Sequence, residues 1–393
     1  MESSGVADEF PVDERGLGMS KYLISCGGTG GHLSPGISLA EGLIARGHEP
    51  VLLVSQKKVD SRLLEKYPHL RFERLPGSGF SFNPLRLLMC LFSQARAIFR
   101  CMQLVRSMQP EALVGFGGFT SAPIVVAGCL LGVPVALHES NRVPGLAVRT
   151  LGRFVRRVYL PPGIRIAAIR TSVTRHLGLP VRREFVRQSQ SSSRLALGLN
   201  PTQKLLVFLG GSQGSGALND WVRSQVAALA GDGIQVYCVT GMGKGRDGVT
   251  EYRAKSGAPV RVEFVAFSDR IAELFSAADL VVSRAGAGTL AELIRCETPA
   301  ILVPFPEAAD DHQRANAAHF ERQGGGIVIE QSALAGLFAE VRDTIFNDWL
   351  LRQFRSNLQR MDRANSLELM LHDLEQLSAR PDVPSAKARP ATA

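Results

Sequence analysis

A single histidine follows a glycine-rich turn near the start of the chain. The stretch "CGGTGGH" at 26–32 leaves an apolar run at 21–25 and places His32 beside the start of a predicted helix. Glycines let backbone amides approach a ligand closely, and a helix N-terminus favours negative charge, so this turn predicts an anion-binding site. A neutral imidazole there, with an ordinary pKa of ~6.5, can accept a proton from a hydroxyl group. The alternative interpretation is a histidine that only caps the helix.

Other polar clusters follow apolar runs further along the chain. His138, Glu139 and Asn141 come directly after the run at 134–138, and "SRAGAGTLAEL" carries Glu292 one helical turn beyond two glycines. A carboxylate in that position can accept two hydrogen bonds from a ribose diol, although it also suits a helix N-terminus electrostatically. The third cluster follows the run at 299–305 and contains Asp310, Asp311, His312, Gln313 and Asn316.

Two classes of site are disfavoured by spacing. The first turn does not give G-x-G-x-x-G, and no acidic residue closes the next apolar run, "PVLLVSQKK", so a nicotinamide dehydrogenase is disfavoured. The 6 cysteines are scattered without C-x-x-C or Cys/His spacing, which predicts buried thiols in a reducing compartment and no structural zinc. No metal site is expected.

These clusters need elements to position them, and the sequence indicates which. Short runs rich in Val, Leu and Ile alternate with helical patterns, which is typical of parallel sheets covered on both faces. The runs lie at 21–25, 50–55, 112–116, 134–138 and 156–160, and again at 204–210, 234–240, 260–265, 279–284 and 299–305. The sequence therefore predicts an α/β fold of two doubly wound, Rossmann-like domains facing a cleft, with a boundary near 177–201.

Charge and hydropathy indicate an anionic partner. The net charge is +9, and residues 149–183 contain nine arginines without an acidic side chain. Residues 80–106 predict a mostly apolar helix with a basic stripe that includes Arg86, Arg96 and Arg100, too short in its apolar run to span a bilayer. Such a helix could lie at a membrane interface or be buried in the domain. Because the arginines lack interleaved aromatics, nucleic acid is not an expected partner.

The two ends of the chain lack the patterns of ordered elements. Residues 1–19 contain no apolar run of a signal peptide or membrane anchor, and residues 380–393 are rich in Pro, Ala and Ser. Both segments are expected to be disordered.

In their order and spacing, "GGTGGH", "GGFTSAP", "LHESN", "GGSQG", "SRAGAGTLAE" and "PFPEAADDHQRANA" resemble the MurG family of bacterial N-acetylglucosaminyltransferases, within glycosyltransferase family 28. The resemblance runs from about Lys21 to about Ala379. It implies a GT-B fold with an acceptor- and membrane-binding domain at 20–181 and a domain at 182–355 that binds UDP-N-acetylglucosamine. It also implies a C-terminal helix at 356–379 that packs back on the first domain.

The resemblance also implies roles for individual residues. His32 matches the family's proposed general base, and the acceptor side would include Phe119, His138 and Glu139. The positions implied to hold the donor are Thr29, Gly30, Gly31, Asn141, Arg182, Ser212, Ser268, Ala287, Gly288, Thr289, Leu290, Glu292 and Gln313. Among them, Glu292 would contact the ribose, Ser212 the diphosphate, Gln313 the acetylglucosamine and the backbone near Ser268 the uracil.

Three positions depart from the family pattern. Phe119 stands where a Tyr is usual, and Val148 and Leu179 each stand where an Asn is usual. These changes remove orienting contacts and affect affinity and acceptor detail more than the type of reaction.

The implied reaction is an inverting displacement without a cofactor. The 4-hydroxyl of the muramyl sugar of lipid I, an undecaprenyl-linked acceptor, would be deprotonated by His32 and would attack the anomeric carbon of the donor. The product would be lipid II for peptidoglycan synthesis, formed at the cytoplasmic face of the bacterial inner membrane by a peripheral enzyme. The alternatives are a GT-B enzyme for another lipid such as a diacylglycerol, a UDP-N-acetylglucosamine 2-epimerase, and a non-catalytic sugar-nucleotide sensor.

Overall fold

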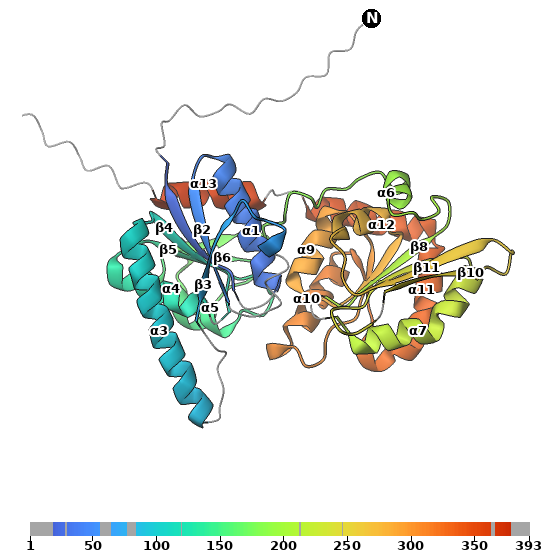
Figure 1. The fold of residues 1–393 in the computed structure, drawn as a ribbon, viewed down its shortest axis with the longest axis horizontal. Coiled ribbons are helices and arrows are strands. Elements are labelled where there is room, and N and C mark those ends of the chain that lie inside the picture. The colour runs from blue at the N-terminus through green and yellow to red at the C-terminus, as the bar shows by residue number, and fades with distance from the viewer. Residues whose placement is uncertain are drawn as a thin grey trace, which may run out of the picture.

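The chain forms two α/β units, each built around a seven-stranded sheet (Figure 1). The computed structural model describes residues 19–27, 30–55, 64–76, 84–118, 120–211, 214–245, 247–362 and 366–378. The first sheet has the order β3-β2-β1-β4-β5-β6-β7, and the second β10-β11-β9-β8-β12-β13-β14. The two predicted parallel-sheet domains are thus confirmed. The tails predicted as disordered, apart from Met19, lie outside the described residues.

The elements of the first unit are β1 (Lys21–Ser25), α1 (Gly30–Ala45), β2 (Glu49–Ser55), β3 (Arg71–Leu75), α3 (Pro84–Met108), β4 (Ala112–Gly115), α4 (Ser121–Leu131), β5 (Val135–His138), α5 (Leu146–Leu151), β6 (Arg157–Leu160) and β7 (Thr174–His176). The second unit contains α6 (Gln190–Ala196), β8 (Leu205–Leu209), α7 (Gly216–Gly231), β9 (Gln235–Val239), β10 (Gly248–Arg253), β11 (Pro259–Val265), α8 (Ile271–Ala277), β12 (Leu280–Ser283), α9 (Ala287–Arg295), β13 (Ala300–Leu302), α10 (His312–Arg322), β14 (Gly326–Val328), α11 (Leu337–Ile345) and α12 (Asp348–Met361). The last helix is α13 (Ser366–Ser378).

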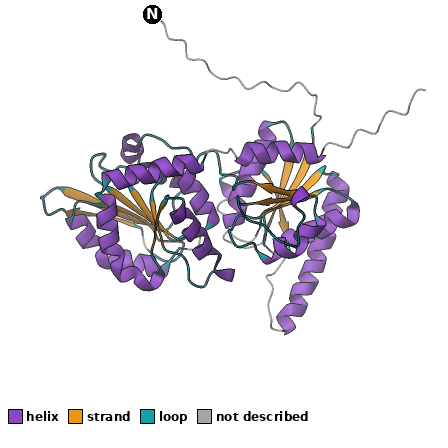
Figure 2. Cartoon of the chain, turned by 180° about the vertical axis from the view of Figure 1, so that it is seen from behind, coloured by secondary structure: helices purple, strands orange, loops and turns teal. Residues whose placement is uncertain are grey.

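The central strands are the apolar runs that the sequence predicts. Every residue of β8, "LLVFL", is buried, because helices cover both faces of the sheet (Figure 2). Each sheet therefore divides its unit into two apolar cores, one on each face. This double covering places the turns at the carboxyl ends of the strands along one edge, where ligands of such sheets bind.

The edge strands were not predicted by the same pattern. β3, β7, β10 and β14 lie at the sheet edges, and several of them are short or polar. β10 is mostly exposed and runs antiparallel to β11, so its "GVTEYR" lacks the continuous apolar run of a central strand. Strands with one open side do not need the composition that buried strands need.

The α3 helix combines a packed end with exposed aromatic side chains. Cys101, Leu104 and Met108 are buried in the first unit, whereas Phe92 is 72% and Phe99 is 60% exposed. Residues 80–83 of the predicted membrane segment, and the side chains of 84–89 and 91, lie outside what the structure describes. Among the described residues, no helix has the length and hydropathy needed to cross a bilayer.

The last helix returns to the first unit. Leu371 of α13 packs on Gly42 of α1, where an added Cβ would lie 2.8 Å from the leucine Cδ1. Asp373 is buried and accepts hydrogen bonds from Arg157 Nε at 2.8 Å and from the Tyr159 hydroxyl at 2.8 Å. The returning helix is thus α13 alone, because residues 356–361 of the segment expected to return belong to α12 in the second unit.

Candidate active site

The site lies where turns of the two units meet. The N-terminal part of α1 faces α9, and Ser34 Oγ lies 3.5 Å from Glu292 Oε1 across the two units. Figure 1 shows α9 and α10 on the side of the second unit that faces the first. Because α1 follows β1 and α9 follows β12, both helices begin at the carboxyl end of a buried parallel strand. The N-terminal halves of α1 and α9 are therefore in contact across the two units.

His32 lies in the first turn of α1, against the turn that follows β4. A Cβ added at Gly117 would lie 3.5 Å from the His32 Nε2 atom, and one at Gly118 would lie 3.4 Å from Nδ1. Both glycines have positive φ, 90° and 71°, so they supply the backbone conformation as well as the space. Burial, with a smaller contribution from His312 of the second unit, lowers the pKa of His32 to about 4. The imidazole is therefore neutral at pH 7 and can accept a proton.

His138 and Glu139 lie beneath the surface. His138 is 1% exposed and its Nε2–H donates to the Gly178 carbonyl at 3.1 Å, so its Nδ1 is an acceptor. This Nδ1 has no hydrogen-bond partner within the described ranges. Glu139 accepts hydrogen bonds from the backbone amides of Asn141 at 2.9 Å and Gly145 at 2.6 Å. Glu139 thus holds the loop after β5 in place, His138 is tied to the segment after β7, and in this conformation neither side chain lines the surface.

Asn141 contacts the second unit instead of open space. Its Oδ1 accepts a hydrogen bond from Asn316 Nδ2 at 3.0 Å, and its own Nδ2 donates to Glu139 Oε1 at 3.2 Å. The neighbouring Arg142 amide donates to Asn316 Oδ1 at 2.9 Å. A predicted donor-binding residue is therefore also part of the contact between the units.

Arg182 and Glu292 are paired with each other. Arg182 Nη2 lies 3.2 Å from Glu292 Oε1, and its Nη1 lies 3.1 Å from Glu184 Oε1. The guanidinium also stacks over the Phe185 ring, with 4.8 Å between Cζ and the ring centroid. Burial raises the pKa of Glu292, and Arg182 opposes that effect. Tyr67, whose hydroxyl donates to Glu184 at 2.9 Å, completes a polar network that the sequence did not predict.

The turn at the start of α9 in the second unit exposes backbone amides. Ala287, Gly288, Thr289 and Leu290 form the first turn of α9, and no described side chain caps that turn. Apart from the Leu290 amide, which donates to the Gly286 carbonyl at 3.0 Å, the amide groups of this turn are thus open to an anion. Gly214 needs its positive φ of 66° and its lack of a side chain, because a Cβ would lie 2.2 Å from the Thr240 carbonyl oxygen. Arg284 was missed by the sequence interpretation; it is buried and donates to Ser215 Oγ, which caps α7, at 2.9 Å.

The remaining predicted residues are spread around these turns. Gln313 Oε1 accepts a hydrogen bond from the Phe305 amide at 3.0 Å. Ser268 follows β11 and accepts a bond from the Arg270 amide at 3.2 Å, so it belongs to a separate loop. Gly30 and Gly31 begin α1, whereas Thr29, Ser212 and Phe119 lie outside the described residues. Of the other departures, Val148 is buried in the core of the first unit, so its apolar side chain has a packing role.

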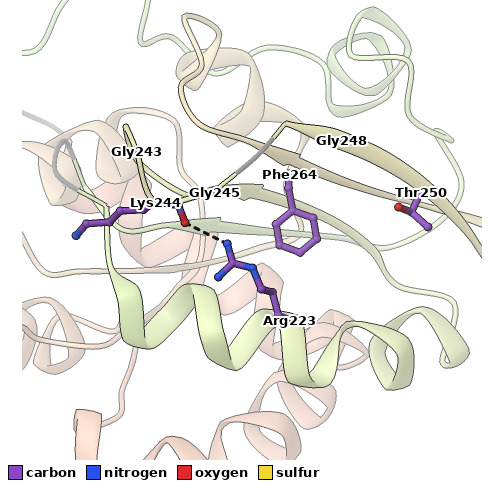
Figure 3. Close-up of a pocket in the computed structure, with 7 residues that line it drawn as sticks. All are labelled: Arg223, Gly243, Lys244, Gly245, Gly248, Thr250 and Phe264. Carbon is purple, nitrogen blue, oxygen red and sulfur yellow. Dashed lines mark hydrogen bonds between the residues drawn. The ribbon is translucent and has the colours of Figure 1, made fainter.

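No predicted site residue lines the cavity drawn in Figure 3, which has a volume of about 610 Å³. It lies between α7, the loop after β9 and the β10–β11 hairpin. Its lining residues are Arg223, Gly243, Lys244, Gly245, Gly248, Thr250 and Phe264. Within the described part of the chain, no cluster of three His, Cys, Asp or Glu side chains could hold a metal ion.

Two facing α/β units, each built on a largely parallel seven-stranded sheet, with strand-following helices in contact between them, have the architecture of the GT-B glycosyltransferases. Residues 22–160 match the glycosyltransferase family 28 N-terminal domain, and residues 205–368 match the family 28 C-terminal domain. The chain belongs to glycosyltransferase family 28.

Its relatives include the UDP-N-acetylglucosamine–N-acetylmuramyl-(pentapeptide) pyrophosphoryl-undecaprenol N-acetylglucosamine transferase of Opitutus terrae. That protein is 61% identical over 360 residues, which cover 92% of this chain and 96% of the relative. The enzyme of the same name from Myxococcus xanthus is 35% identical, covering 81% of this chain and 82% of its own. The crystal structure of Acinetobacter baumannii MurG has the same fold, with a TM-score of 0.67 and 24% identity, covering 91% of this chain and 99% of that one.

Proposed function

We propose that the chain transfers N-acetylglucosamine from UDP-N-acetylglucosamine to the muramyl 4-hydroxyl of lipid I and so makes lipid II. The observation that carries this proposal is the 61% identity to the Opitutus terrae transferase over 92% of the chain. The site is chemically suited to the reaction, because a neutral imidazole lies on one side and open backbone amides lie on the other. Peptidoglycan synthesis is the process that this activity serves.

The donor is assigned to the second domain, residues 182–355, and the acceptor to the first, residues 20–181. The open amides at the start of α9 suit a diphosphate, and the Glu292 carboxylate suits the ribose diol. Because Arg182 is paired with Glu292, the ribose would have to share or displace that guanidinium. Gly30, Gly31 and Ser212 are assigned to the diphosphate and sugar, Gln313 to the acetyl sugar and the Ser268 backbone to uracil.

The mechanism is a direct displacement. His32 accepts the proton of the muramyl 4-hydroxyl as that oxygen attacks the anomeric carbon, and the bond from this carbon to the UDP oxygen breaks. The configuration at the carbon inverts, and the leaving diphosphate is stabilised by the amides of the α9 turn. A bound diphosphate also offsets the desolvation of the imidazolium, whose formation burial opposes in the free chain.

The first domain is assigned to the membrane, where the polyprenyl acceptor resides. Phe92 and Phe99 are exposed on the same helix as the exposed Arg96, which gives α3 both apolar and cationic contacts for an anionic lipid surface. This surface, with residues 80–106 and the arginines of 149–183, would place a peripheral enzyme on the cytoplasmic face of the inner membrane.

The proposal is tested by incubating the chain with labelled UDP-N-acetylglucosamine and three acceptor conditions: a lipid I analogue, a diacylglycerol, and none. Label in a disaccharide lipid only with the lipid I analogue is the expected result. Transfer only to the diacylglycerol, isomerisation of the donor without acceptor, or donor binding without any reaction would each overturn the proposal. These outcomes would indicate another lipid glycosyltransferase, a 2-epimerase or a sensor, respectively.

A further inference from the structure

Asn316 connects the two domains through a single buried amide. It lies on α10, is 3% exposed, and its Oδ1 accepts the Arg142 amide of the first domain at 2.9 Å. Its Nδ2 donates to Asn141 Oδ1 at 3.0 Å and to the Ala285 carbonyl at 3.2 Å. One side chain therefore makes two hydrogen bonds to the first domain and one to the second.

The chemistry of these contacts restricts the residue that can make them. A planar side-chain amide has one acceptor oxygen and an NH2 group with two donor hydrogens. These match the Arg142 amide, which donates, and the oxygens of Asn141 and Ala285, which accept. An aspartate would turn a negative oxygen toward the Asn141 and Ala285 oxygens, and an alanine would leave buried polar groups without partners. The contact thus depends on the amide and not merely on its volume.

The partners of Asn316 lie in functional segments of both domains. Ala285 immediately precedes the turn assigned to the nucleotide, and Asn141 follows the strand that ends at His138. Asn141 is fixed from its other side by Glu139, which holds both its backbone amide and its Nδ2. A continuous chain of hydrogen bonds therefore runs from the nucleotide turn to the loop of the first domain after β5.

We propose that Asn316 is a positioning residue that sets the separation between donor and acceptor domains in the state competent for transfer. The inference rests on the proposed function, because it assigns the contact to that reaction. A nearby ion pair, Arg149 with Asp310 at 2.7 Å, also crosses between the domains. Both of its side chains are about half exposed, so it is the weaker contact.

Replacement of Asn316 is expected to affect turnover far more than donor binding. Most groups assigned to UDP, namely the α9 turn, Glu292, Ser212 and the Ser268 backbone, belong to the second domain, so the Kd of UDP should change less than about threefold. Transfer requires the two domains to hold the acceptor hydroxyl close to the anomeric carbon of the donor. A misplacement of about 1 Å between them lowers kcat by about a hundredfold. Small-angle scattering should show a larger radius of gyration for the variant.

The test compares Asn316→Ala and Asn316→Asp with Asn357→Ala. Asn357 is a matched control because its Nδ2 bonds to the Gly324 carbonyl at 3.0 Å within the second domain. The expected result is a loss of kcat and an expanded shape in both Asn316 variants, with UDP affinity kept and the control unchanged. The isosteric aspartate keeps the test valid if the alanine variant does not fold.

A double-mutant cycle with Asn141→Ala measures the coupling in kcat between the two residues. If Asn316 acted only within the second domain, this coupling would be absent. If the Asn316–Asn141 contact carries the effect, the double variant is no slower than the slower single variant. Parental kcat in both Asn316 variants, equal loss of UDP binding and kcat, or full additivity in the cycle would overturn the proposal. If the unmodified chain transfers nothing to lipid I, the proposed function fails, whereas the scattering comparison still tests the domain contact.

Discussion

Replacing His138 by glutamine should remove part of the acid sensitivity of the first domain. His138 packs between the rings of Phe116 and Tyr159 and is 1% exposed, and burial lowers its pKa to about 4. In the unfolded chain this pKa is ~6.5. A glutamine amide can still donate to the Gly178 carbonyl that now accepts from Nε2. The variant therefore keeps the hydrogen bond and removes the titrating group.

The sign and the size follow from these two pKa values. Because the folded-state pKa is the lower one, the unfolded chain binds more protons between about pH 6.5 and pH 4. The stability that neutral His138 contributes is complete above about pH 6.5 and is lost as pH falls through that window. With an unfolded pKa of ~6.5 and a folded pKa of about 4, the loss between pH 7.5 and pH 5 is about 2 kcal/mol.

Hydrogen exchange of peptides from β4 and β5 measures this loss in the first domain. Trp221 and Trp349 both lie in the second domain. Their fluorescence during urea unfolding therefore reports the stability of that domain, which the His138 substitution should leave unchanged. His319, whose pKa burial also lowers, is present in both proteins, so its effect cancels in the comparison, whereas the charge of His32 adds to the lowering of the His138 pKa that the variant removes. An equal loss of opening free energy from pH 7.5 to pH 5 in the parent and in His138→Gln would refute the reasoning.

Three further results are expected. Asp373→Asn should lower the stability of the first domain by about 2–4 kcal/mol in urea unfolding, because the buried Tyr159 hydroxyl and the Arg157 guanidinium lose a carboxylate partner; an unchanged midpoint would contradict this account of α13. Glu139→Gln should slow transfer about 10–100-fold, since one amide face cannot accept all the hydrogen bonds that fix the loop after β5, and parental rates in a steady-state assay would show that this loop is not needed. Phe92→Ser and Phe99→Ser should each weaken sedimentation with anionic vesicles about tenfold, while equal binding would exclude α3 from the lipid contact.

The sequence predicted the two sheets because buried parallel strands need continuous apolar runs. β8 and β12 show this directly, since each of their residues is buried. The same reasoning could not predict the edge strand β10, which is mostly exposed, carries polar residues and runs antiparallel to β11. The segment 356–379 was expected to return to the first domain, but its first residues, 356–361, belong to α12 of the second domain.

The candidate site was predictable as a set of turns but not as a set of contacts. Glycine spacing indicated where amides would be open, and the structure brings the N-terminal halves of α1 and α9 together. Sequence could not show that Arg182 pairs with Glu292, or that Asn316 reaches Asn141, because both contacts join residues more than 100 positions apart. It also could not show that His138 is buried, since a histidine at a strand end suits either a surface or a core position.

The most direct test of the central claim is the rate at which His32→Ala transfers labelled N-acetylglucosamine to a lipid I analogue. His372→Ala is a suitable control, because that histidine is exposed on α13. We predict that the His32 variant loses at least about a hundredfold in kcat and keeps its affinity for UDP, while the control transfers at the parental rate. Equal transfer by the parent and His32→Ala would contradict the assignment of His32 as the general base.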